Sequence, residues 1–136
     1  MYKNILVPVD VSHADAAIEV LRKAHGLLDE GGNITTLYAM NTMPGYISAY
    51  VSKDEIDKSK EEIKAKLAEV SSAAGTHVKT MLRDGSAGPV IVEVAKEIGA
   101  DLVIVASHSP GLQDYLIGST AGRVVRHAGC SVLVHR

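Results

Sequence analysis

The chain has 136 residues, with 14 Lys and Arg against 16 Asp and Glu, so its formal net charge is −2 with the six His neutral. This length predicts one domain, and 46% hydrophobic with 22% charged residues supports a packed core and excludes disordered, collagen-like and coiled-coil classes. The balanced charge provides no general attraction to nucleic acid or an anionic membrane, and a chain with five Tyr but no Trp or Phe lacks the usual platform for stacking bases.

The chain opens with a strand and a helix. Residues 5–9 form a continuous apolar run, which predicts a strand buried on both faces, with Pro8 at its end. Ser12, followed three residues later by Asp15, resembles a capping box, and apolar residues at helical spacing then predict a helix from about residue 13 to 29.

A second strand and a second helix follow. Gly31-Gly32 is expected to break the first helix, and residues 33–40 have the composition of a strand. Residues 41–51 lack periodicity and are expected to form a mobile lid over the site. Ser52 and Glu55 predict a capping box for a charge-rich helix that ends at Gly75. Its apolar stripe consists of Ile56, Ile63, Leu67, Val70 and Ala74.

The second half repeats this alternation. Residues 76–82 read as a third strand and residues 83–86 as a turn. Gly88-Pro89 opens a helix that Gly99 closes, and residues 102–106 form a fourth buried strand.

The last part of the chain contains a loop, a helix and a strand. Residues 107–117 are expected to form the loop, Gly118-Ser119-Thr120 leads into the helix, and residues 131–135 form the last strand. Five strands alternating with four helices predict an α/β fold: a doubly wound, five-stranded parallel sheet with helices on both faces. Ligands bind such sheets at the carboxyl ends of the strands, so the loops after Val9, Met40 and Ala106 are the candidate site.

Two of these loops carry chemistry. Asp10 places a carboxylate beyond the first strand, where it either binds a ribose, a base or a metal, or only caps the following helix. Gly118-Ser119-Thr120 either presents free amides to a phosphate or is an ordinary turn with a Ser N-cap. Arg123, near Thr120 in sequence, either reaches such an anion or belongs to a solvated stripe with Arg126 and His127.

A combination of short motifs resembles the universal stress protein family. These motifs are Pro8-x-Asp10-x-Ser12, Ser107-His108, Gly118-Ser119 and the ending Ser131-Val132-Leu133-Val134. The resemblance spans residues 1–136 as a single domain and implies a Rossmann-like fold of the adenine-nucleotide alpha-hydrolase type.

The resemblance also implies an adenine-nucleotide site. In nucleotide-binding members, residues equivalent to Pro8, Val9 and Asp10 meet the adenine and ribose, and backbone equivalent to Ala39 and Met40 lines the adenine. ATP or AMP is the implied ligand, with Mg²⁺ accompanying ATP through phosphates and water.

The phosphate loop departs from the family pattern. The family pattern is Gly-x-x-Gly, then nine residues, then Gly-Ser/Thr. This chain instead has Ala106-Ser107-His108-Ser109, then eight residues, then Gly118-Ser119, so both early glycines are missing. UspA-like members that lack these glycines are not expected to hold ATP. The retained residues nevertheless resemble the short-loop UspF and UspG branch, which binds adenine nucleotide; they are Ser107, Gly111, Gly118, Ser119 and Thr120.

Enzymatic alternatives have weaker support. The chain has no Gly-x-x-x-x-Gly-Lys-Ser/Thr loop and no Lys after Lys96, which argues against a dedicated ATPase. His108 without a carboxylate partner, and Ser119 without a base, leave at most slow hydrolysis or autophosphorylation. A phosphoacceptor receiver would need an acidic cluster where only Asp10 stands.

Cysteine and histidine usage points to a protein without structural metal or disulfide. The six His are scattered and do not fall at metal-ligand spacing. Cys130 alone cannot form an internal bridge, and no apolar run near Met1 is long enough for a signal peptide or a membrane span, so a cytoplasmic location is expected.

The last strand suggests self-association. Val132, Leu133 and Val134 form an apolar strand near the chain end, and an unprotected sheet edge invites pairing. The family resemblance implies a homodimer along this strand, with a tetramer as a larger assembly. The sequence thus predicts a nucleotide-responsive stress regulator that binds ATP or AMP; the alternative is a nucleotide-free, UspA-like module that acts through an unknown protein partner.

Overall fold

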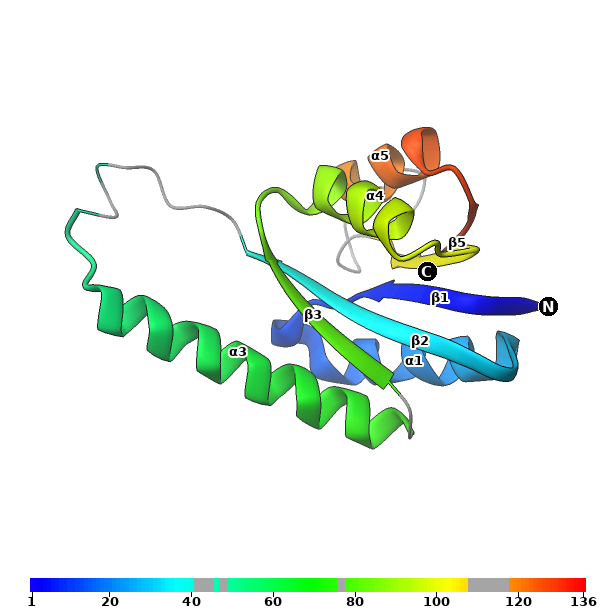
Figure 1. The fold of residues 1–136 in the computed structure, drawn as a ribbon, viewed down its shortest axis with the longest axis horizontal. Helices are drawn as coiled ribbons and strands as arrows, with labels where there is room; N and C mark the ends of the chain where they lie inside the picture. The colour runs from blue at the N-terminus through cyan, green and yellow to red at the C-terminus, as the bar shows by residue number, and fades with distance from the viewer. Residues whose placement is uncertain (41–45, 47–48, 76–77, 108–117) are drawn as a thin grey trace.

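The fold is one parallel sheet between two layers of helices (Figure 1). The computed structural model describes residues 1–40, 46, 49–75, 78–107 and 118–136. Five strands pair in the order β3-β2-β1-β4-β5, all parallel, which confirms the predicted fold class. The strands are β1 (Tyr2–Pro8), β2 (Leu28–Met40), β3 (Val78–Asp84), β4 (Leu102–Ala106) and β5 (Ser131–His135). The helices are α1 (Ala14–Leu27), α3 (Lys53–Ala74), α4 (Ala87–Glu97) and α5 (Ser119–His127), and a 3-10 turn, η1 (Val11–His13), precedes α1.

Each sheet face carries its own aliphatic core. Helices α1 and α3 cover one face, and α4 and α5 cover the other (Figure 1). Alternate residues of β1 divide between the two cores: Ile5 and Val7 face α1, while Leu6 faces α4. All three side chains are fully buried, as the unbroken apolar run of β1 predicts for a strand covered on both faces.

The junction between α1 and β2 differs from the sequence prediction. Strand β2 begins at Leu28, directly after α1, so Gly31-Gly32 lies inside the strand and does not end the helix. Tyr2 pairs with Leu28 and Asn4 with Asn33, so residues 29–32 lie opposite Lys3 alone. Gly31 has φ of 79°, and a Cβ on Gly32 would lie 2.8 Å from the Lys3 carbonyl oxygen. The two glycines therefore allow the irregular pairing of β2 with β1 at this point. A sequence pattern cannot distinguish such a pair of glycines from a helix stop.

The start of α1 also differs from the prediction. Ser12 is not the cap of a box with Asp15, because it lies in η1 and donates to Asp10: its N and Oγ are 3.0 and 2.5 Å from Asp10 Oδ1. The residue at the N-cap of α1 is His13, which makes no side-chain capping bond. The capping residue is Asp10, at the N-cap of η1, because a carboxylate accepts stronger, charge-assisted hydrogen bonds than a hydroxyl does.

Helix α3 begins as predicted. Glu55 N donates to Ser52 Oγ at 3.1 Å, which is the expected N-cap. Leu67 and Val70 are buried, whereas Ile56 and Ile63 are only partly buried. The reason is visible in Figure 1, where the first half of α3 extends beyond β3 and past the sheet.

The β3–α4–β4 segment follows the prediction with shifted boundaries. Arg83 and Asp84 extend β3 through the region expected to be a turn, because Ala39 and Met40 of β2 pair with them. At its other end α4 closes in a Schellman motif: Gly99 has φ of 66°, and Ala100 N donates to Ala95 O at 2.8 Å. The observed β4 and β5 match their predicted ranges.

Three predictions fall wholly or partly on undescribed segments. The expected lid over residues 41–51 lies mostly outside the described residues, as do residues 76–77 at the expected start of β3 and most of the loop 107–117. None of the described helices is long and apolar enough to cross a membrane.

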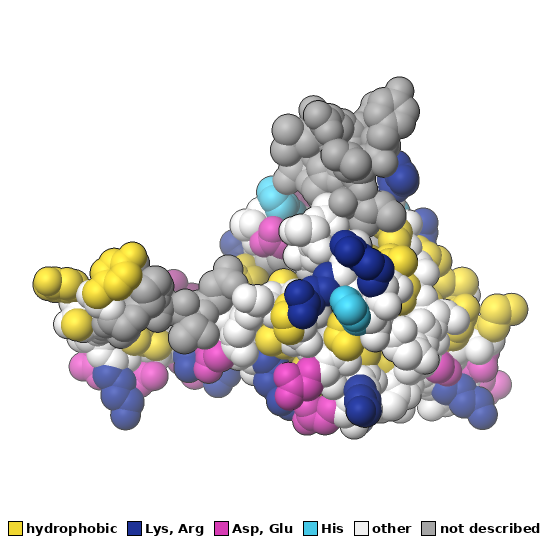
Figure 2. All heavy atoms as spheres, turned by 90° about the horizontal axis from the view of Figure 1, so that it is seen from above, with side chains coloured by type: hydrophobic (Ala, Val, Ile, Leu, Met, Phe, Trp, Pro, Cys, Tyr) yellow, Lys and Arg dark blue, Asp and Glu magenta, His cyan; other side chains and the backbone are white. Residues whose placement is uncertain are grey.

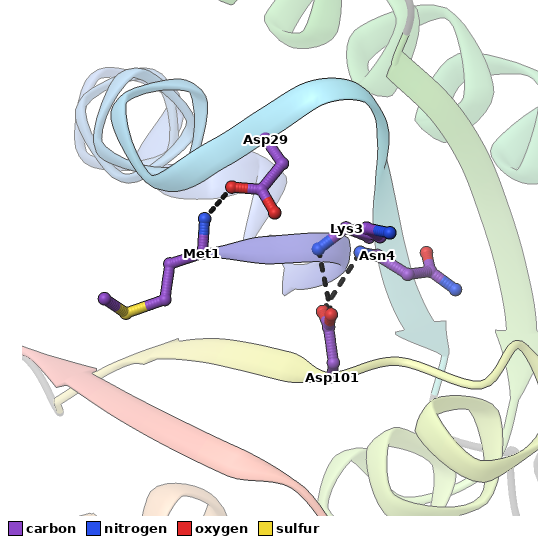
Figure 3. A network of polar contacts seen from close by, with 5 residues as sticks. All are labelled: Met1, Lys3, Asn4, Asp29 and Asp101. Atoms are coloured by element: carbon purple, nitrogen blue, oxygen red, sulfur yellow. Dashed lines mark hydrogen bonds and ion pairs between the residues drawn. The ribbon is translucent and has the colours of Figure 1, made fainter.

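At the amino edge of the sheet, Asp101 joins β1 to the turn before β4 (Figure 3). Its carboxylate accepts the backbone N–H groups of Lys3 at 2.8 Å and Asn4 at 3.0 Å, and Asp101 N donates to Asn4 O at 2.9 Å. Asp29, from the start of β2, pairs with the amino group of Met1 nearby. Burial raises the pKa of Asp101, but the backbone hydrogen bonds and the N-terminal charge together hold it below its usual value.

Candidate functional site

The candidate site is a cavity of about 650 Å³ at the carboxyl edge of the sheet. Strand β1 is the point at which the winding of the chain reverses: β2 and β3 follow on one side of it, and β4 and β5 on the other. The loops that leave β1 and β4 go to opposite faces, which leaves room between them. The cavity lies at this position, lined by residues at the ends of β1, β2 and β4.

The cavity brings together seven of the twelve residues predicted for the ligand site. They come from three strand ends and from the first turn of α5: Pro8, Val9, Asp10, Ala39, Ala106, Ser107 and Thr120. Met40, Gly118 and Ser119 are described but do not line the cavity. His108 and Gly111 lie outside the described residues.

The inner wall of the cavity is apolar. Leu37 and Val105 contribute from β2 and β4, and Ile91 from α4. On the opposite side, small residues of α1 leave space where larger side chains would fill it. The apolar spacing of the helical residues predicts only core packing, so the sequence gives no sign that they line a cavity. The remaining lining residues are His13, Ala16, Ala17, Val20, Tyr38 and Ala87.

Asp10 lies at the rim, and the structure shows the capping role, one of the two alternatives that the sequence left open for it. Its Oδ1 accepts both hydrogen bonds from Ser12 and so holds η1 in place. Its Oδ2 lies 3.8 Å from His13 Nε2, and both side chains are about 60% exposed at the cavity mouth. One oxygen thus serves the fold while the other is accessible to a ligand.

The first turn of α5 has no side-chain cap. Gly118 is its N-cap residue, so the alternative of an ordinary Ser N-cap is wrong. The first intrahelical bond runs from Gly122 N to Gly118 O at 2.8 Å, and the amides before Gly122 precede this ladder. Thr120 lies in this turn and lines the cavity, so the amide-rich end of α5 adjoins the cavity.

Backbone hydrogen bonds hold the strand ends that form the cavity. Val9 N donates to Leu37 O at 2.8 Å, which joins the end of β1 to β2. Met40 O accepts from Gly85 N at 2.6 Å, and Ser107 N donates to His135 O at 2.8 Å. Met40 thus helps to hold the end of β2 beside the cavity.

Two other features bear on the site. In the part of the chain that the structure describes, no three His, Cys, Asp or Glu side chains come together to hold a metal ion. A second hollow of about 670 Å³ lies over β2 and β3, but Asn4, Asn33 and Ile98 place it toward the amino ends of the strands. It therefore lies away from the edge at which doubly wound sheets bind ligands.

This strand order, with a cavity at the switch point, defines a Rossmann-like α/β domain. The model of the universal stress protein family matches residues 1–136. Universal stress protein G of Escherichia coli O157:H7 is 30% identical over 145 aligned positions that cover all of both chains, and that of Salmonella typhimurium is 31% identical over the same extent. The chain belongs to the universal stress protein family.

Solved structures show the same fold. The chain is similar to the protein MJ0577 with a TM-score of 0.78 and 26% identity, covering 99% of this chain and 96% of that one. A universal stress protein solved with cAMP has a TM-score of 0.70 at 21% identity, covering 99% and 97%. One from Archaeoglobus fulgidus solved with dAMP has a TM-score of 0.64 at 18% identity, covering 99% and 98%. At these last two identities the likeness shows the fold alone.

Proposed function

We propose that this universal stress protein binds ATP or AMP in the cavity at its switch point and acts as a nucleotide-responsive stress regulator. The observation that carries the proposal is the cavity itself, which joins an apolar wall to an exposed carboxylate and the uncapped end of α5. Adenine, ribose and phosphate require these three environments in this sequence along the molecule. A cytoplasmic location belongs to the same proposal.

The residues divide along the ligand. The adenine packs against the apolar wall beside Val9, Leu37 and Ala39, where the planar base displaces water from the aliphatic side chains. Oδ2 of Asp10 accepts a hydrogen bond from a ribose hydroxyl at the rim. The phosphates lie toward Ser107 and the first turn of α5, at Thr120, where backbone amides and the helix dipole favour negative charge.

The relatives support the ligand class. One family structure was solved with cAMP and another with dAMP, and both share this fold. Both ligands contain adenine and at least one phosphate group, as ATP and AMP do. Mg²⁺, if it accompanies ATP, would be held by the phosphates and water, because the described residues contain no cluster of metal ligands.

The first experiment identifies the ligand. The freshly purified protein is denatured, any released nucleotide is identified by chromatography and mass spectrometry, and ATP and AMP are then titrated into the emptied protein. We expect either nucleotide to raise the melting temperature in proportion to the logarithm of its concentration. If neither nucleotide co-purifies or binds at millimolar concentration, the missing glycines at Ala106 and Ser109 decide against the proposal, and the nucleotide-free alternative replaces it.

A cavity-filling variant places the ligand. Ala106 lines the cavity and its side chain is exposed, so Ala106→Leu adds volume to the site without disturbing the core. We expect at least about a tenfold loss of nucleotide affinity, since displaced contacts of a few CH₂ equivalents exceed about 1.4 kcal/mol. Ala65→Leu, an exposed substitution in α3, is the matched control. Unchanged binding in Ala106→Leu would move the ligand to another site.

Two substitutions separate the roles of Asp10. Asp10→Asn keeps an oxygen that can accept from Ser12, whereas Asp10→Ala removes it. We expect Asp10→Ala to cost about 1 kcal/mol of stability through the lost cap, and both variants to weaken nucleotide binding. If Asp10→Asn binds nucleotide as the wild type does, the carboxylate has only the structural role.

We also propose that two copies pair along β5. The strand lies at the edge of the sheet, and Val132, Leu133 and Val134 are only partly buried within one copy. Pairing would satisfy the open side of this strand. A dimer, or a tetramer built from dimers, then gives the protein a surface through which nucleotide binding reaches a regulatory partner.

A further inference from the structure

We propose that Arg123 is the cation that contacts the phosphate chain in the proposed site and makes binding selective for phosphorylated ligands over the nucleoside. This inference rests on the proposed function and adds to it a charged contact outside the motifs that predicted the site. Its basis is the packing between α5, which carries Arg123, and the first turn of α4.

A missing side chain on α4 accommodates the stem of Arg123. Gly88 lies in the first turn of α4 and is buried. A Cβ built on Gly88 would lie 2.7 Å from Cδ, 3.3 Å from Cβ and 3.4 Å from Cγ of Arg123. The aliphatic stem of Arg123 thus lies across Gly88, and any larger residue there would displace it.

This packing places Arg123 at the carboxyl edge of the sheet. Neighbours of both residues line the cavity, Ala87 beside Gly88 and Thr120 one turn before Arg123. Side chains on a helix lean toward its N-terminus, and the N-termini of α4 and α5 both lie at this edge. Arg123 is exposed and does not itself line the cavity, but it lies one helical turn from Thr120, which does.

The charge of Arg123 has no counterpart among the described residues. It forms no ion pair or hydrogen bond with any of them, whereas Arg83 pairs with Glu97 at 2.8 Å and Arg126 Nε donates to Gly122 O at 3.2 Å. Figure 2 shows Lys, Arg and His side chains gathered on the face over α4 and α5. A guanidinium near two positive helix ends is unfavourable alone and becomes favourable when an anion binds between them.

The test compares ATP with adenosine by isothermal titration calorimetry. In Arg123→Gln we expect ATP affinity to fall about tenfold while adenosine affinity changes less than about twofold, because one charge-assisted contact is lost. Arg126→Gln is the matched control and should change neither. Gly88→Ala keeps the charge but displaces the stem, and should also weaken ATP selectively.

The outcomes distinguish this inference from the proposed function. The inference is overturned if Arg123→Gln loses affinity equally for ATP and adenosine, or loses affinity for neither. The proposed function still stands in that case, provided that the wild type binds ATP. If the wild type binds neither ATP, AMP nor adenosine, both fall together. Should thermal melting show that Arg123→Gln is unfolded, Arg123→Lys and Gly88→Ala decide: retained ATP selectivity in Arg123→Lys with its loss in Gly88→Ala supports the contact, and unchanged selectivity in Gly88→Ala refutes it.

Discussion

Replacing Asp101 with Asn tests how the amino edge of the sheet is held. The carboxylate accepts backbone N–H groups of two successive residues of β1, at 2.8 Å from Lys3 and 3.0 Å from Asn4. These residues are separated from Asp101 by 98 and 97 positions, so the contact closes the fold between its first and fourth strands (Figure 3). The side-chain amide of Asn at position 101 keeps one oxygen that can accept a backbone N–H, but its NH₂ group faces the other backbone N–H, and two donors cannot form a hydrogen bond.

The expected cost follows from these contacts. Asp101→Asn loses one hydrogen bond and the charge that strengthens the other, which in a partly exposed site amounts to about 1–2 kcal/mol. For a domain of this length, with an unfolding entropy of about 2 cal/mol/K per residue, the melting temperature should fall by about 4–7 °C. The surface pair between Asp29 and the Met1 amino group should contribute much less.

The cost should depend on pH in a defined direction. The pKa of Asp101 is lowered in the folded protein, so unfolding takes up a proton at acidic pH. The stabilisation is therefore fully present above the unfolded pKa of about 4 and is lost as pH falls through the lower folded pKa. The difference between wild type and Asp101→Asn should shrink over this acidic range.

The assay is thermal or urea unfolding of wild type, Asp101→Asn and the control Asp29→Asn, between neutral pH and pH 2. The control should lower the melting temperature by about 1 °C or less at neutral pH, since an exposed ion pair contributes little. An equal effect of both substitutions, or a deficit in Asp101→Asn that stays constant down to pH 2, would refute the assignment of the stability to the charged carboxylate.

Two further predictions concern association and thiol chemistry. Leu133→Lys should dissociate the proposed dimer, because it places a charge beside the β5 edge. Light scattering measures the mass in solution, and an unchanged mass rejects the interface. Because Leu133 also contacts the core of its own copy, thermal melting must show that the variant is still folded. Burial raises the pKa of the Cys130 thiol, and the charge of Asp101 raises it further, so Cys130 should react with iodoacetamide at pH 7.5 several times more slowly than in the urea-unfolded chain; equal rates, measured by mass spectrometry, would contradict its burial.

Local patterns predicted those elements whose determinants lie close together in sequence. Strands β4 and β5 were predicted with their observed bounds, and the Ser52 cap of α3 was predicted from its spacing to Glu55. The alternation of five strands with four helices sufficed for the fold class, because parallel strands require crossovers. Where a local pattern had two physical meanings the prediction failed: Gly31-Gly32 reads as a helix stop but forms an irregularity opposite Lys3.

The sequence by itself determined the family, the doubly wound fold and the three strand ends that line the cavity, which lie at Asp10, Ala39 and Ser107. Only the tertiary structure decided what surrounds them. The apolar wall is assembled from β2, α4 and β4, small residues of α1 line the opposite side, and the contact of Gly88 with Arg123 joins two helices. Such contacts depend on distances across the fold, which follow from strand order and helix packing. The spacing of residues along the chain does not predict them.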